Sequence, residues 1–226
     1  MQRYNSFNQI HKALRALLYD TALSLQQTDF IVKAECDAAV EKVVAVLDLF
    51  EEHADNEDTH ILPAIFSFEP SIVDAFEQEH VQDLELSRKL HLTIAELYRP
   101  TTPVEKQTLG RQLTITFIQF MVFNLNHMAK EEEILNEILW RYYTDDEIKK
   151  IEAVIRQSAP AAKQPFVIKW MLRGISNSEA VAWLKGLQQQ LPIPVFDGIL
   201  AIAEAELPAS RIQQITAQLA QPVTVA

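Results

Sequence analysis

Four long segments of the chain carry apolar residues at helical spacing, and this periodicity constrains the fold more than any other feature. The segments run roughly from Tyr4 to Gln26, Ile31 to Phe66, Pro70 to Tyr98 and Pro103 to Tyr143. Residues three or four positions apart share one face of an α-helix, so each segment predicts a long amphipathic helix. Glycine is scarce, at 4 residues, and alternation at period two is hard to find. We therefore expect an all-α fold without a sheet.

Each apolar stripe also contains polar residues of kinds that proteins rarely bury. The stripes hold His11 in the first helix, His53 and Glu57 in the second, His80 in the third, and His127 and Glu131 in the fourth. The third stripe is predicted to comprise Phe76, His80, Leu84 and Ser87. Each half of this region thus supplies one helix with a lone histidine and one with a His-x-x-x-Glu pair. Two helical hairpins packed as a four-helix bundle would bring the six side chains to one level of the interior.

This pattern points to a metal site because buried ionised groups need compensation. An imidazole and a carboxylate at i and i+4 lie about one helical turn apart and can bind one metal or two adjacent metals. Burying each ionised group costs on the order of several kcal/mol unless a cation offsets it. Four histidines and two bridging carboxylates would give each of two metals four protein ligands and leave a position open. Nitrogen and oxygen ligands without thiolate favour non-haem iron, with manganese or zinc as alternatives.

These motifs resemble those of the hemerythrin-like family, the His/His/Glu cation-binding bundles, over roughly residues 4–143. The matching stretches are NQIHKALR, FEEHADNEDTHILP, FEQEH and FNLNHMAKEEEIL. The resemblance implies a four-helix up-down bundle that holds an oxo- or hydroxo-bridged di-iron centre. It implies that the terminal metal ligands are four histidines, His11, His53, His80 and His127. It implies that the bridging ligands are two glutamates, Glu57 and Glu131.

The third helix departs from the oxygen-carrying hemerythrins, which have a fifth histidine one turn before His80. Phe76 stands there, so the pattern is closer to the four-His subgroup that includes bacterial proteins linked to repair of iron–sulfur centres under nitrosative stress. The resemblance implies binding of, or reaction with, a small diatomic ligand or oxidant such as O2, NO or peroxide. An iron donor for damaged iron centres and a metal-binding protein without a redox role are the alternatives. Whether the protein is an enzyme stays open at this point.

Other titratable residues near the motifs receive weaker assignments. His60 shares the face of His53 and Glu57, and it could be an extra ligand, a residue that orients a ligand, or a residue at the mouth of the site; we favour the last two. His91 lies too far from His80 to share the site and is expected to be partly exposed. Five acidic residues beside the stripes are expected to be solvated, although any of them could orient a ligand: Glu51, Glu52, Asp58, Glu132 and Glu133.

Charge and composition exclude several classes of partner. The formal net charge is −11 and the pI about 5.0, whereas binding of nucleic acid or an anionic membrane needs clustered Lys and Arg. No apolar run approaches the ~20 residues that span a bilayer, and the first residues lack a signal-peptide pattern. We expect a soluble, cytoplasmic protein. The single cysteine, Cys36, cannot form an internal disulfide, and we interpret it as a packing residue.

The composition changes after residue 143, and we predict a division into a metal-binding bundle at 1–143 and a helical C-terminal extension at 144–226. The extension has no histidine and holds most of the prolines. Capping-box patterns at Thr144/Glu147 and Ser176/Glu179 start two of its helices, and further short helices are expected at 164–174, after Pro194 and after Pro208. These helices could bury a small core of their own or pack on the bundle.

Overall fold

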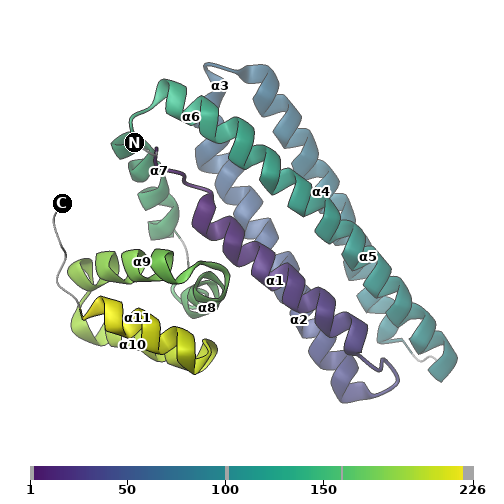
Figure 1. The fold of residues 1–226 in the computed structure, drawn as a ribbon. Coiled ribbons are helices and arrows are strands. Elements are labelled where there is room, and N and C mark those ends of the chain that lie inside the picture. Colours follow the sequence, from purple (N-terminus) through teal and green to yellow (C-terminus); the bar gives the residue numbers. More distant parts are fainter. Residues whose placement is uncertain (1–2, 100–101, 159, 221–226) are drawn as a thin grey trace. The chain divides into compact units, whose positions relative to one another are not determined.

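A computed structural model describes residues 3–99, 102–158 and 160–220 of the chain, and every regular element in them is helical. The all-α prediction is therefore confirmed for these residues. The first half contains α1 (Asn8–Gln27), α2 (Lys33–Asn56), the π-helical turn η1 (Glu57–Ile61), α3 (Leu62–Phe66) and α4 (Pro70–Leu97). It is followed by α5 (Pro103–Lys130), the π-helical turn η2 (Glu131–Leu135), α6 (Asn136–Tyr142) and α7 (Asp145–Ser158). The last elements are α8 (Gln164–Gly174), α9 (Asn177–Gln190), α10 (Ile193–Glu206) and α11 (Ala209–Leu219) (Figure 1).

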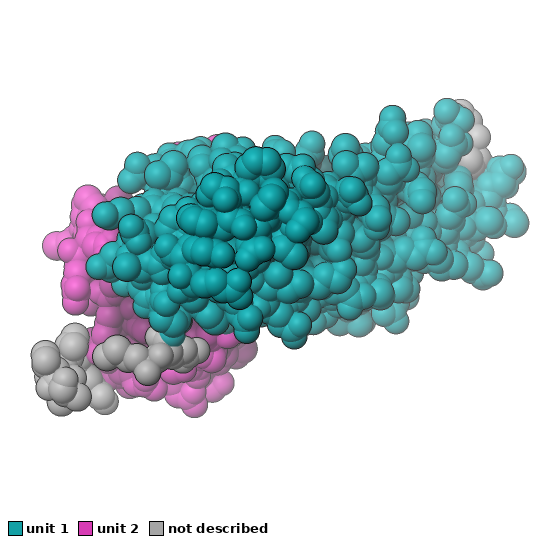
Figure 2. Space-filling model, turned by 90° about the horizontal axis from the view of Figure 1, so that it is seen from above, with its two compact units in different colours: residues 1–8, 17–158 teal, residues 9–16, 159–226 magenta. Residues whose placement is uncertain are grey.

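The contacts divide the chain into two compact units, coloured teal and magenta in Figure 2. Unit 1 comprises Met1–Asn8 and Leu17–Ser158, and unit 2 comprises Gln9–Ala16 and Ala159–Ala226. Helix α1 therefore contributes residues to both units. The predicted boundary at residue 143 rests on the change in composition, whereas the contacts place α7 in unit 1. The division into a bundle at 1–143 and an extension at 144–226 stays a prediction.

Unit 1 is built as a bundle of long helices in which neighbours in sequence run in opposite directions (Figure 1). Helix α4 packs along α5 and also against α2. Tyr98, which follows the last residue of α4, donates a hydrogen bond at 3.2 Å to Asp37 near the start of α2. Lys42 of α2 donates at 2.7 Å to Asp20 of α1. A capping box formed by Thr102 and Glu105 begins α5, the last of the four long helices.

Helix α7 joins unit 1 through both apolar and charged contacts. Ile148 is buried in a core cluster with Phe7, Ile61 and Leu135. The Arg3 guanidinium lies 2.6 Å from Asp145 and also donates to the carbonyls of residues 140 and 143. The pKa of the Asp145 carboxyl is lowered chiefly by the hydrogen bond from this guanidinium. The segment before α1 and the start of α7 are thus tied to the same end of the bundle.

The helices of unit 2 bury a core of their own, which is one of the two arrangements considered for them. Helix α8 packs against α10, and α9 packs against α11. Arg211 of α11 donates to Asn177 at 2.6 Å and to the carbonyl of Ile175 at 2.7 Å, so it closes the turn between α8 and α9. The Ser176–Glu179 capping box is present. The buried core residues are Leu172, Ile175, Ala180, Val181, Leu184, Phe196, Ile199, Ala203, Leu207 and Ile215.

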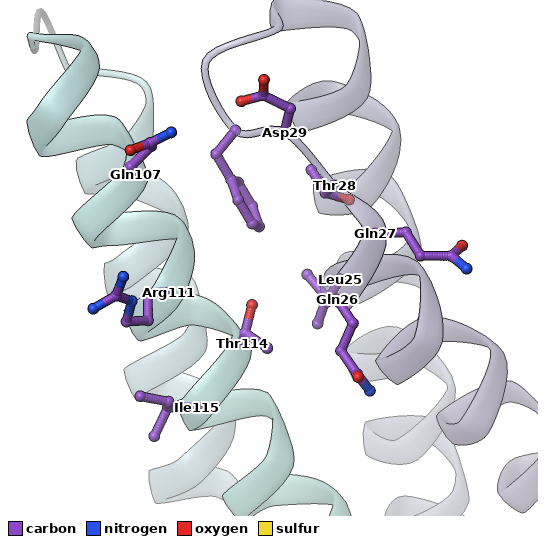
Figure 3. Close-up of a pocket in the computed structure, with 10 residues that line it drawn as sticks. Leu25, Gln26, Gln27, Thr28, Asp29, Gln107, Arg111, Thr114 and Ile115 are labelled. Carbon is purple, nitrogen blue, oxygen red and sulfur yellow. The ribbon is translucent and has the colours of Figure 1, made fainter.

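A pocket of about 530 Å³ lies in unit 1 between the end of α1, the loop after it and α5 (Figure 3). Arg111, Gln107 and Thr114 line it from α5, and Thr28 and Asp29 line it from the loop. None of the stripe histidines or glutamates lines this pocket. In the part of the chain that the structure describes, no helix combines the length and the apolar character needed to cross a bilayer.

Candidate metal centre

Two π-helical turns position the two stripe glutamates. The first turn begins at Glu57 and the second at Glu131, so each starts at the glutamate of a His-x-x-x-Glu pair. The N–H of Leu62 donates to the carbonyl of Glu57, and the N–H of Asn136 donates to that of Glu131, each five residues on. Turns of this kind insert one residue into an α-helix and recur at functional sites. The apolar period predicts long helices over both stretches but indicates neither π-helical turn.

The inserted residue changes which side chains point inward after each glutamate. Ile61 is buried and His60 only half-buried, although the α-helical period places His60 on the inner face. In the fourth helix the period of His127 and Glu131 predicts an inward Ile134, but Leu135 is fully buried while Ile134 is 37% exposed. A π turn advances the chain by one residue more than an α turn, and this explains both shifts. His60 is not among the side chains that share the cluster described below.

Glu57 lies between two histidines of different helices. Its Oε1 atom is 3.2 Å from Nε2 of His53, one turn earlier in α2. Its Oε2 atom is 3.5 Å from Nε2 of His80 in α4. The carboxylate is almost completely buried, at 3% exposure. Each of its oxygens faces a different imidazole, which is the arrangement expected of a carboxylate that bridges two cations.

His80 and His127 are oriented by carboxylates behind them. Nδ1 of His80 lies 2.7 Å from Oδ1 of Asp58, and Nδ1 of His127 lies 2.9 Å from Oε2 of Glu79. An ionised carboxylate only accepts hydrogen bonds, so each Nδ1 carries the hydrogen. In the neutral imidazole the lone pair is then on Nε2. Both rings therefore present a lone pair to the interior, as histidines do when a second carboxylate fixes them for metal binding.

The atoms that face one another in the interior are all electron donors. Nε2 of His80 is 3.1 Å from Nε2 of His127, and the latter is 2.9 Å from Oε1 of Glu131. Ligand atoms of Glu57, His80, His127 and Glu131 all lie within 4.8 Å of one another. Two neutral imidazoles cannot satisfy each other lone pair to lone pair, so a cation has to sit among them, either a proton or a metal ion. The donor set fits a metal that prefers nitrogen and oxygen.

The electrostatics of the metal-free cluster show how strongly it attracts positive charge. Burial alone disfavours a charged His80, but the carboxylates of Glu57 and Asp58 outweigh it and raise the pKa to about 9. The pKa of His127 is raised as well: burial opposes the charge, and the carboxylates of Glu131 and Glu79 favour it more. Without a metal, protons hold this cluster together, and a metal ion would replace them.

An apolar wall and a polar pair surround the cluster. Phe76, one turn before His80 in α4, is buried, with its ring centroid 5.7 Å from that of His127. Asn124 lies one turn before His127, and Asp83 lies one turn after His80. The Asn124 amide donates to Asp83 at 2.5 Å, and both side chains are buried. Burial raises the pKa of the Asp83 carboxyl. Asp83 occupies the inward position that the predicted stripe gave to Leu84, which is 58% exposed.

The structure thus brings together five of the six predicted site residues, all in unit 1: His53, Glu57, His80, His127 and Glu131. The sixth, His11, is fully buried in α1, in the stretch that groups with unit 2. The role of all six residues as metal ligands stays a prediction. His91 is exposed, as expected.

Two carboxylates that orient histidines have no definite role in the sequence pattern. Asp58 was one of the acidic residues expected to be solvated, and it is 44% exposed while orienting His80. Glu79 was missed, because it lies beside the apolar stripe and only its place next to His80 in the sequence could have drawn attention to it.

The comparison with known families agrees with this geometry. The family model of the hemerythrin HHE cation binding domain matches residues 3–139, which is more than half of the chain. No curated protein and no solved structure matches the chain significantly. The matched range contains every stripe histidine and glutamate and ends before α7. The chain therefore belongs to the hemerythrin family, through an HHE cation-binding domain.

Proposed function

We propose that the protein is a non-haem di-iron protein whose centre lies among the stripe histidines and glutamates. The observation that carries the proposal is Glu57, whose two oxygens face two histidines of different helices. Glu131 would be the second bridge. The terminal ligands would be His11, His53, His80 and His127. For His11 the support is the repeat in the sequence and a family match that includes its helix.

Iron suits this ligand set best, with manganese and zinc as the competitors. The donors are imidazole nitrogens and carboxylate oxygens, and the one cysteine, Cys36, is buried in α2 and absent from the cluster. When bound, a di-iron centre would supply one-electron and two-electron chemistry and an open position for a small molecule. The protein would contribute the ligands, the carboxylates that orient them and an apolar wall that limits water.

We propose a small diatomic ligand or oxidant, such as O2, NO or peroxide, as the partner of the centre. The ring of Phe76 lies beside His127 where oxygen-carrying relatives have a fifth ligand, which supports a place in the four-His subgroup and disfavours reversible O2 carriage. The acidic charge disfavours nucleic acid and anionic membranes as partners. A cytoplasmic location belongs to the same proposal. Donation of iron for repair of damaged iron centres is the alternative use of the same site.

The first experiment is metal analysis of protein produced with ample iron, together with absorption spectra of the reduced protein before and after O2 and NO. We expect about two irons per chain, since two bridging carboxylates and four histidines suffice for two metals. A spectral change with one gas would support sensing or reaction with that gas. Transfer of iron to an acceptor protein without such a change would favour the donor role. Protein with no iron, or with one firmly held zinc, would refute the di-iron proposal.

A further inference from the structure

The first turns of α1, which carry His11, make their contacts with the C-terminal helices. Residues Gln9–Ala16 belong to unit 2, together with the chain from residue 159 onward. The remainder of α1 belongs to unit 1. The family match ends at residue 139, so α8 and α9 lie outside the cation-binding domain and the match gives them no role.

A glycine lies where the end of α8 meets the backbone of this part of α1. Gly174 is the last residue of α8, and a Cβ atom added to it would lie 2.3 Å from the carbonyl oxygen of Lys12 and 3.0 Å from the backbone N of Ala13. Among the described glycines none has a positive φ, so Gly174 is not needed for an unusual backbone conformation. Gly174 is needed because it has no Cβ atom, and only a residue without a side chain lets the two backbones come this close.

An ion pair fixes the same turn of α1 to the start of α9. The ammonium of Lys12 donates to Oε1 of Glu179 at 2.5 Å, and both side chains are largely buried, at 33% and 24% exposure. The other oxygen, Oε2, accepts from the backbone N–H of Ser176 at 2.8 Å in the capping box of α9. One carboxylate therefore joins the first turn of α9 to the residue that follows His11.

We propose that the corner between α8 and α9 positions His11 and thereby sets the affinity of the metal position that His11 serves. This inference rests on the proposed function. It gives the C-terminal helices a role: they hold one ligand-bearing turn through the backbone at Gly174 and the side chain of Glu179. Displacement of this corner would weaken the iron held by His11 and leave the cluster of Glu57, His80, His127 and Glu131 in place. His11 is the ligand, and Gly174, Lys12 and Glu179 are positioning residues.

The test compares Gly174→Ala with Gly186→Ala in the full chain. The added methyl group meets backbone at residue 174 and nothing within 4 Å at residue 186, and both glycines are helical. We expect Gly174→Ala to bind one of the two irons at least ~10-fold more weakly, as outer-shell changes do. Mössbauer spectra of the iron-57 protein should show one altered iron and one unaltered iron, and hydrogen exchange of residues 9–16 should be faster in the metal-free variant. Gly186→Ala should match the wild type in all three.

Lys12→Ala provides a second route that adds no bulk, in case Gly174→Ala fails to fold. It should speed hydrogen exchange in residues 9–16 and weaken the same iron. Unchanged exchange and unchanged iron spectra in both variants, with two irons in the wild type, would overturn the inference and leave the proposed function standing. Wild-type protein that binds no pair of irons would overturn both.

Discussion

Asp58 Oδ1 lies 2.7 Å from Nδ1 of His80, so the residue directly after one predicted bridging glutamate orients a histidine of the neighbouring helix. Glu79 does the same for His127, from the position directly before His80. The two contacts link η1 to α4 and α4 to α5. The segment of Glu57 thus supplies the group that fixes His80, and the helix of His80 supplies the group that fixes His127.

Replacing Asp58 by Ala should lower metal affinity without removing a ligand. The carboxylate holds the Nδ1 hydrogen of His80, so its loss frees the ring to rotate and to change tautomer. Partners of this kind are worth ~10–100-fold in metal affinity. Competition with a chelator would measure the change. Asp55→Ala is the control, because Asp55 is an exposed residue in the last turn of α2, just before η1. Equal affinities in the two variants would show that the Asp58 contact has no role in binding.

Removal of a bridging glutamate should cost the centre most of its metal. Glu57→Ala and Glu131→Ala each take away a carboxylate that is almost fully buried in the cluster. His91→Ala removes an exposed imidazole from α4, the helix that also carries His80, and should leave the metal content unchanged. Elemental analysis of the three purified proteins measures this directly. The same metal content in all three would refute the site assignment.

The long helices were predictable to within a few residues because their apolar faces repeat over many turns. Positions three and four residues after an inward residue share its helix face, however, so both Asp83 and Leu84 are candidates for the inner side of α4 after His80. Asp83 is buried there and Leu84 is exposed. Asp83 is inward because Asn124 of α5 meets it there, a contact between helices that periodicity within one helix does not contain.

The π turns were hidden for a similar reason. A single inserted residue shifts the inner face by about one position, and the sequence shows it only as a mismatch, such as an outward Ile134 beside an inward Leu135. Pro63, which lacks an N–H, follows the first π turn, but a glutamate, Glu137, stands at the matching place after the second. The two turns therefore do not share a proline. They share a buried glutamate at the first position of the turn.

Deletion of one residue in a π turn should be tolerated better than deletion in an α-helix. Removing the exposed Thr59 takes out the inserted residue of η1, so the helices on either side keep their faces while Glu57 shifts. Removing the exposed Glu51 from α2 turns the residues on one side by ~100° relative to those on the other. We expect the first protein to stay folded with weakened metal binding and the second to lose most of its thermal stability. Circular dichroism melts and metal analysis measure both effects. Similar melting temperatures for the two deletions would contradict this interpretation of the π turn.

Two glycine substitutions should change stability in opposite directions. A Cβ at Gly110 in α5 would lie 2.2 Å from the ring of Phe30, and overpacking of this kind costs ~1–3 kcal/mol. A Cβ at Gly198 in α10 would meet nothing within 4 Å, so Gly198→Ala should gain ~0.5–1 kcal/mol from helix propensity alone. Denaturant unfolding of both variants measures the free energies. A stabilising Gly110→Ala would show that Phe30 moves aside at little cost.

The metal-free protein should lose stability as the pH rises above neutrality, whereas metal affinity should rise over the same range. The neighbouring carboxylates raise the pKa of His80 from 6.5 to about 9 in the folded, metal-free cluster. A histidine whose pKa is higher in the folded protein than in the unfolded chain stabilises the fold fully at pH values below its unfolded-state pKa. That contribution is lost as the pH rises through the folded-state pKa, so for His80 the loss falls between about pH 6.5 and 9. A metal needs the same nitrogen without its proton, so its binding at pH 7 should release protons. Calorimetry in buffers of different ionisation enthalpy would count these protons, and melts of chelator-treated protein would follow the stability. Binding without proton release at pH 7 would mean that the metal does not displace protons from this imidazole cluster.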